Sequence, residues 1–231
     1  MTKAFYLLLL CLPLLWITGS LHAQPDPPQT PKSLVVGRFS LNQQVEGIPL
    51  GWKIKRWAGS YQISIEHESD QNDVLHFKSQ GTSFGLYKEV KVNLKEYPIL
   101  SWHWKITQLP TGGDVRSKKT DDQAAQVYVV FPRFPAMVNS RMVGYIWENL
   151  TPKGLQVQSQ KSSNTRYIVL QSGASLLGTW QGERRNVYKD YKTLFGEEPP
   201  EVGGITLMID SDDTHSSAES FFNDIQFEPN H

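Results

Sequence analysis

Short runs in which apolar and polar residues alternate recur along the chain from residue 33 onward. In one of them, Tyr61, Ile63 and Ile65 share one side of an extended chain, and polar residues share the other. About eleven such runs, separated by Gly, Pro, Asn or Asp, predict an all-β sandwich or barrel. The runs are 33–40, 51–57, 61–69, 73–79, 84–94, 99–106, 123–131, 141–149, 165–173, 204–212 and 221–229.

One segment before residue 200 departs from this alternation. Val187, Tyr191 and Leu194 recur at the spacing of one helix face, and Gly196 follows where a helix would end. We therefore expect one short helix that covers an end of the sandwich.

The N-terminal residues have the pattern of an export signal. The apolar run Phe5–Ile17 is too short to span a bilayer comfortably, and Ala23 ends a processing-like triplet. We expect residues 1–23 to be a cleaved signal and 24–32 a Pro-rich leader. The alternative is an uncleaved anchor. Residues 33–229 form the single predicted domain, which we expect to be periplasmic or secreted, with no membrane contact after cleavage.

Charge and cysteine content exclude several classes of function. The chain has 23 Lys+Arg and 23 Asp+Glu without a sustained charge run, which argues against nucleic acid as a partner. The single cysteine, Cys11, lies in the signal, so the mature chain has neither disulfides nor thiol chemistry. HExxH, GxxxxGK[ST] and GxGxxG motifs are absent from the sequence.

Two adjacent carboxylates precede an apolar run. If the strand begins there, Asp122 shares a face with Gln126 and Tyr128, and Asp121 lies on the opposite face. The face with Gln126 and Tyr128 is the more polar, so Asp122 and Tyr128 are candidate ligand-binding residues. The alternative is a polar strand-edge pair that is solvated, or that is bonded to loop amides or to Arg116.

Aromatic residues repeat at strand spacing in two further runs. Trp102 and Trp104 share one strand face, and Tyr145 and Trp147 share another. Such rings either form a platform for the C–H faces of sugars or fill the core of the sandwich. We include Trp102, Trp104 and Trp147 as candidate ligand-binding residues.

Charged residues supply two more candidate sites. Arg185 could grip an acidic ligand in a bidentate fork, or it pairs internally with Asp190. Asp210, Asp212 and Asp224 offer hard oxygen ligands for a structural calcium ion, the one cofactor we consider. The alternative for these aspartates is a polar turn between the last strands.

The ordered motifs YPILSWHWKI, LPTGGDVRSKKTDDQAAQVYVVF, GYIWEN and MIDSDDTHSSAESFFNDIQF resemble the bacterial secreted family DUF 3047. The resemblance spans Leu34 to Phe227 and implies an exported protein without a known activity. The opening FSLNQQVEGIPLGWKI and the closing FFNDIQF are also similar to the ends of galactose-binding-like, carbohydrate-binding jelly rolls. This similarity implies a jelly-roll-like antiparallel β-sandwich whose first and last strands pair.

Three functions remain open on these grounds. The leading hypothesis is a binding module for a glycan or another small ligand of the cell envelope. The second is a polysaccharide-active hydrolase or lyase, for which Asp122 and Glu148 are the only pair of acids to test. The third is a non-catalytic structural protein of the envelope whose aromatic residues are all buried.

Overall fold

The computed structural model describes Met1, residues 32–69 and residues 72–230. Residues 2–31, which hold nearly all of the predicted signal and leader, lie outside the described part. Among the described residues, no helix is both long and apolar enough to cross a bilayer.

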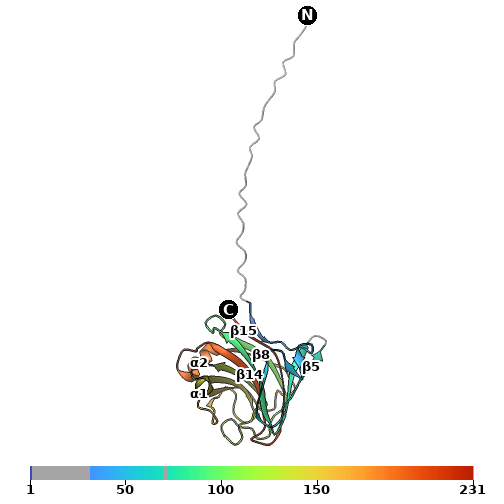
Figure 1. The fold of residues 1–231 in the computed structure, drawn as a ribbon, viewed down its shortest axis with the longest axis vertical. Coiled ribbons are helices and arrows are strands. Elements are labelled where there is room, and N and C mark those ends of the chain that lie inside the picture. The colour runs from blue at the N-terminus through green and yellow to red at the C-terminus, as the bar shows by residue number, and fades with distance from the viewer. Residues whose placement is uncertain (2–31, 70–71, 231) are drawn as a thin grey trace. The chain divides into compact units, whose positions relative to one another are not determined.

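Two sheets pack face to face in the described part (Figure 1). The six-stranded sheet has the order β13-β8-β15-β6-β5, and β1 also pairs with β15. Its members are β1 (Leu34–Gly37), β5 (Gln62–Ser69), β6 (Asn72–Gln80), β8 (Ile99–Gln108), β13 (Gln181–Asn186) and β15 (Ser217–Glu228). All its pairings are antiparallel, and the pairing of β1 with β15 confirms that the first and last strands of the sandwich are neighbours.

The seven-stranded sheet has the order β11-β12-β10-β9-β14-β7-β4. Its members are β4 (Lys53–Ala58), β7 (Ser83–Val92), β9 (Ala125–Phe131), β10 (Arg141–Glu148), β11 (Gln156–Gln158), β12 (Thr165–Ser172) and β14 (Val202–Asp210). Only β10 and β12 pair in parallel within this sheet as described. A small hairpin joins β2 (Gln44–Val45) to β3 (Ile48–Pro49).

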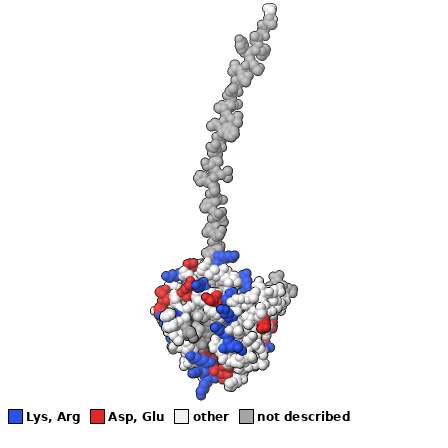
Figure 2. Space-filling model, in the orientation of Figure 1, with Lys and Arg blue, Asp and Glu red and all other residues white. Residues whose placement is uncertain are grey.

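The eleven predicted runs all contain strands, so the jelly-roll-like antiparallel sandwich is confirmed. The short strands β2, β3, β11 and β13 were not predicted, because none of them contains more than one of the apolar residues whose alternation marks a strand. Basic and acidic side chains are interspersed on the face of the described part that Figure 2 shows.

The predicted helix is α2 (Val187–Phe195). The side chain of Asn186 caps its start by accepting a hydrogen bond from Lys189 N at 2.9 Å. Gly196 ends it in the left-handed region at φ 71°, where a side chain would be strained. A second, four-residue helix, α1 (Ala136–Asn139), lies in the connection between β9 and β10 and was not predicted.

The space between the sheets contains the tryptophans that we had considered for a sugar platform. Trp102 and Trp104 are both 0% exposed, and Trp147 is buried beside them. Their rings pack edge to face, with centroids 5.4 Å apart for Trp102–Trp104 and 6.0 Å apart for Trp104–Trp147. The prediction of these three residues as ligand-binding is wrong, because alternation shows which residues share a face but not which face is buried.

Candidate ligand-binding site

A pocket of about 350 Å³ lies on the outer face of the seven-stranded sheet, the face turned away from the core. We call it the outer pocket. Strand β9 contributes Gln126 and Tyr128, and β12 contributes Thr165 and Tyr167. Strand β10 pairs with β9 on one side, antiparallel, and with β12 on the other side, parallel, so β9 and β12 flank β10. Tyr128, predicted as ligand-binding, is therefore on the wall of a pocket.

A glycine on β10 makes room for the two tyrosines. Gly144 lies opposite both Tyr128 and Tyr167 in the strand register. A Cβ atom at Gly144 would meet Tyr167 Cδ1 at 2.7 Å and Tyr128 Cε1 at 2.9 Å, which is closer than such atoms approach. The rings lie over this position with centroids 6.1 Å apart, and the two hydroxyl oxygens are 3.2 Å apart, within hydrogen-bond distance.

Two buried uncharged polar groups of the outer pocket lack partners among the described residues. Gln126 is 1% exposed, and its Oε1 accepts from the Tyr128 hydroxyl, but its Nε2 has no hydrogen-bond partner among the described residues. Thr165 is 2% exposed, and its Oγ1 is likewise without a partner in the described part. Unsatisfied buried polar atoms are rare and costly, so their presence on the wall of a pocket points to a polar ligand.

An exposed tryptophan stands at the rim of the outer pocket. Trp57 lies on the edge strand β4 and is 57% exposed, in contrast to the buried core tryptophans. We did not predict Trp57 as a site residue. The sequence does contain a signal for this residue. Trp57 lies on the same strand face as Lys53 and Lys55, and packing gives no reason for a large apolar ring on such a polar face.

Asp121, and not Asp122, lines the outer pocket. Its Oδ1 accepts a hydrogen bond from Gln123 Nε2 at 3.0 Å. Burial raises the pKa of Asp121 to about 6, with smaller contributions from the charges of Asp213 and Glu148, although the bond from Gln123 opposes this shift. A carboxyl group with such a pKa exchanges protons near neutral pH.

Asp122 has a different position from the one that strand alternation predicted. Its carboxylate is 0% exposed and accepts from the backbone of Asp213 at 3.2 Å and of Thr214 at 2.6 Å. Strand β9 begins only at Ala125, so the alternation used to place Asp122 beside Gln126 does not extend to it. The prediction of Asp122 as a ligand-facing group is wrong; the alternative of an edge group bonded to loop amides is correct.

The candidate catalytic pair of Asp122 and Glu148 also loses its support. Glu148 is fully buried, and its carboxylate accepts from Val115 N at 2.9 Å and from Asn149 N at 2.9 Å. Leu150 N and Thr151 N also donate to it. Both carboxylates are occupied in holding loops, so neither is open to a substrate.

Three carboxylates meet at one end of the outer pocket. Asp122, Asp210 and Asp212 each have an oxygen within 4.8 Å of the others. Burial raises the pKa of Asp210 to about 10, and a hydrogen bond with Asp212 and the charges of Asp122 and Asp212 add to the shift. Asp212 Oδ1 is buried without a partner in the described part of the chain. An orphaned oxygen in such a crowded cluster fits a bound cation, and the calcium prediction remains a prediction for Asp210 and Asp212.

Asp224 does not belong to this cluster, which corrects its prediction as a calcium ligand. Its carboxylate lies 3.7 Å from His103 Nδ1 and 4.0 Å from Arg38 Nε, on the six-stranded sheet. The sequence places Asp224 only fourteen residues after Asp210, but the two strands β14 and β15 belong to different sheets.

Lys161 provides the positive charge of the outer pocket. Its Nζ lies 2.5 Å from Asp213 Oδ2. Burial opposes the charged form of Lys161, yet the bond with Asp213 and the charges of Asp210 and Asp121 outweigh burial and raise its pKa. The lysine therefore offsets one of several acidic groups, and the pocket keeps an excess of hydrogen-bond acceptors.

Arg185 is engaged within the fold. Its guanidinium forms a fork with Asp190, from Nε to Oδ2 at 3.0 Å and from Nη2 to Oδ1 at 2.7 Å. Asp190 also accepts from the Tyr145 hydroxyl at 2.8 Å, which ties α2 to the seven-stranded sheet. The alternative, an internal ion pair between Arg185 and Asp190, is therefore correct, and the prediction of Arg185 as a ligand-binding residue is wrong.

Residues 51–226 match the family described as "Protein of unknown function (DUF3047)", and the chain belongs to this family. The predicted family membership is thereby confirmed. Among curated proteins, none matches the sequence.

Several solved structures resemble the described fold. The family 30 carbohydrate-binding module of the cellulosomal cellulase Cel9D-Cel44B of Clostridium thermocellum has 9% identity and a TM-score of 0.48, covering 86% of this chain and 98% of that chain. The family 11 module of Lic26A-Cel5E from the same organism has 10% identity and a TM-score of 0.42, with 84% and 96% covered. The xyloglucanase domain of NopAA from Sinorhizobium fredii has 11% identity and a TM-score of 0.43, with 84% and 97% covered. At these values the similarities carry no argument about ligand or activity.

Proposed function

We propose that the protein binds a small, uncharged, polyhydroxylated ligand, a sugar unit of a glycan, in the outer pocket. The observation that carries the proposal is the pair of unpartnered buried groups, Gln126 Nε2 and Thr165 Oγ1, on the wall of an open pocket. A hydroxyl group both donates and accepts, so one ligand hydroxyl can satisfy each of them.

Other lining residues of the outer pocket match the C–H face and the hydroxyl groups of a sugar. The exposed ring of Trp57 offers an apolar face for C–H groups. Asp121 and Asp212 supply acceptors for hydroxyl groups, and their charge disfavours anionic sugars. A volume of about 350 Å³ lies in the lower part of the usual range for small-molecule pockets, about 300–1,000 Å³, so we expect one or two sugar units rather than a long chain in direct contact.

The proposal includes export. The signal-like residues 1–23 support a periplasmic or secreted location, where envelope or extracellular glycans are the available ligands. Cell fractionation of the full chain tests this part: recovery of a shortened protein outside the cytoplasm supports it, and full-length protein in the cytoplasm contradicts it.

Calorimetric titration with methyl glycosides of glucose, galactose, mannose and N-acetylglucosamine tests the binding function. We expect saturable binding of at least one of them to the wild-type protein, about tenfold weaker binding to Trp57→Ala and a similar loss for Gln126→Leu. Leu94→Ile, a substitution between the sheets, is the matched control for indirect effects of mutation. Equal affinity for wild type and both pocket variants would contradict the site, and no binding at all would favour a structural role in the envelope.

A further inference from the structure

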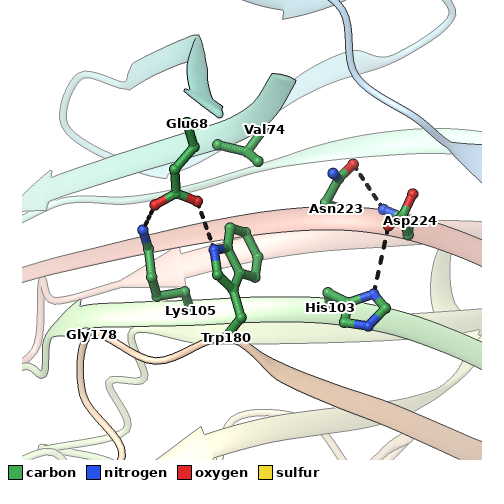
Figure 3. Close-up of a pocket in the computed structure, with 8 residues that line it drawn as sticks. All are labelled: Glu68, Val74, His103, Lys105, Gly178, Trp180, Asn223 and Asp224. Carbon is green, nitrogen blue, oxygen red and sulfur yellow. Dashed lines mark hydrogen bonds and ion pairs between the residues drawn. The ribbon is translucent and has the colours of Figure 1, made fainter. Parts of the chain in front are cut away.

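A second cavity, of about 460 Å³, lies on the outer face of the six-stranded sheet (Figure 3). We call it the Trp180 cavity. Its residues on β8, His103 and Lys105, alternate with the core residues Trp102 and Trp104 and therefore face outward. The Trp180 cavity shares no lining residue with the outer pocket, which lies on the other sheet.

The indole of Trp180 is held in place on one side of this cavity. Its Nε1 donates to Glu68 Oε2 at 2.6 Å, and the other carboxylate oxygen of Glu68 pairs with Lys105 (Figure 3). Lys105 Nζ also lies 5.3 Å from the centre of the Trp180 ring. A ring that is already oriented loses little conformational entropy when a ligand stacks on it.

An irregularity in β15 brings two consecutive polar residues to the same cavity. In a regular strand Asn223 and Asp224 would point to opposite faces. The pairing of β15 with β8 shifts register between Asn223 and Gln226, and Asp224 has a left-handed φ of 52°. Both side chains consequently line the Trp180 cavity, while Ile225 returns to the core. A bulge that redirects a polar side chain in this way is frequent beside functional sites.

The side chain of Asn223 has an unused donor in this cavity. Asn223 is 7% exposed, and its Oδ1 accepts from Asp224 N at 2.9 Å. Its Nδ2 makes no hydrogen bond with the rest of the described chain, although the amide carries two donor hydrogens. A side-chain amide that lines the cavity with a donor no described residue engages, beside an oriented indole, fits a ligand that accepts hydrogen bonds and has an apolar face.

The charges of the cavity favour a neutral ligand. Glu68 and Lys105 pair with each other, and His103 Nδ1 lies 3.7 Å from Asp224 Oδ2. Among the described residues that line the cavity, no cation is left without an acidic partner to attract an acidic ligand, whereas the Asp224 carboxylate can still accept from hydroxyl groups.

We propose that the Trp180 cavity is a second site for a neutral sugar ring, with the ring stacked on Trp180 and its hydroxyls bonded to Asn223 and Asp224. The two sites lie on opposite outer faces of the sandwich, so one molecule would hold two glycan segments at once. Two linked binding events raise the overall affinity for a glycan-rich surface without any new contact.

The test is a titration of the ¹⁵N-labelled chain from residue 24 onward with the same four methyl glycosides, followed by nuclear magnetic resonance. We expect the indole Nε1–H signal of Trp180 and the side-chain amide signal of Asn223 to shift with a saturable dependence on one sugar. In Trp180→Ala the Asn223 shift should require about tenfold more sugar. Trp57→Ala should leave both responses unchanged. Trp180→Phe, which keeps a ring but lacks the bond to Glu68, covers the case in which the alanine variant does not fold, and it should bind more weakly than the wild type.

Three outcomes would overturn the second site. The first is that the signals of Trp180 and Asn223 stay fixed with every sugar. If residues of the outer pocket respond in the same spectra, only the second site is contradicted and the proposed function still holds. The second is that Trp57→Ala abolishes the response at Trp180, because the two sites would then not be separate. The third is unchanged affinity of the Asn223 response in both Trp180 variants.

Discussion

Aromatic rings cluster on both sides of the seven-stranded sheet, but their surroundings differ. On the inner side, Trp147 of this sheet packs against Trp104 of the other sheet, among apolar side chains. On the outer side, Tyr128 and Tyr167 lie beside Gln126, whose buried Nε2 has no partner in the described chain. The comparison teaches that aromatic residues alone do not mark a binding site. The indole nitrogens of Trp102 and Trp104 also lack partners in the described chain, but they are enclosed between the sheets. Aromatic residues mark a binding site where they lie beside unsatisfied polar atoms on the wall of an open pocket, because a ligand can reach those atoms there.

The largest effect should come from removing an inner ring. Trp104→Ala deletes a side chain that is fully enclosed between the sheets, and we expect a loss of about 3–5 kcal/mol in the free energy of unfolding. Trp57→Ala removes an equally large ring from the rim of the outer pocket and should change stability by less than about 0.5 kcal/mol. Urea unfolding followed by circular dichroism measures both. Equal losses for the two variants would show that Trp57 is a packing residue.

Calcium should produce the next largest effect if Asp210 and Asp212 hold it. A cation that binds only the folded state adds about 2.7 kcal/mol at a concentration of 100 times its Kd. We expect the melting temperature to rise with added calcium, to fall again with a chelator, and to respond to neither in Asp212→Asn. A melting temperature of the wild type that is insensitive to calcium would contradict the prediction.

The pH dependence without calcium should report on Asp210. Its pKa in the folded state, about 10, is far above the value of about 3.9 for an unperturbed aspartate. The unfolded chain therefore releases this proton first, so the contribution of Asp210 to stability is complete below about pH 4 and declines as the pH rises toward 10. Asp210→Asn has no such proton to lose, so its stability relative to the wild type should rise from pH 4 to pH 8, with no gain at pH 4. Leu94→Ile, which removes no titratable group, is the control and should keep the pH profile of the wild type.

A smaller effect should follow from filling the space under the two tyrosines. Gly144→Ala places a methyl group against Tyr128 and Tyr167, and we expect a loss of about 1 kcal/mol in stability together with a loss of sugar binding. The inner ring cluster should be unaffected, as the near-ultraviolet circular dichroism of the tryptophans would show. Unchanged sugar affinity in this variant would mean that the ligand does not contact the tyrosines.

Much of the fold could be predicted because it depends on local patterns. Alternation located each long strand, and the spacing of Val187, Tyr191 and Leu194 with Gly196 located α2. The assignment of faces failed for Trp102 and Trp104, because two stacked sheets offer each strand an inner and an outer side with the same alternation. Only the packing of the second sheet decides between them.

The binding site was less accessible to sequence reasoning, because it depends on register between distant strands. The outer pocket combines Trp57 with residues from β9, β12 and β14, and no local pattern specifies that β10 and β12 pair in parallel. Irregular backbone caused the other errors. The pattern of β9 does not extend to Asp122, and the bulge in β15 turns Asp224 toward His103.

The side-chain amide of Gln126 offers the most direct measurement of the central claim, that a sugar completes the hydrogen bonds of the outer pocket. In a ¹⁵N–¹H spectrum its Nε2 signals should move and exchange more slowly with solvent when a methyl glycoside saturates the protein, because the ligand then accepts its free donor. If a sugar binds to saturation while the Gln126 signals keep their position and exchange rate, the ligand is elsewhere and the account of this pocket is wrong.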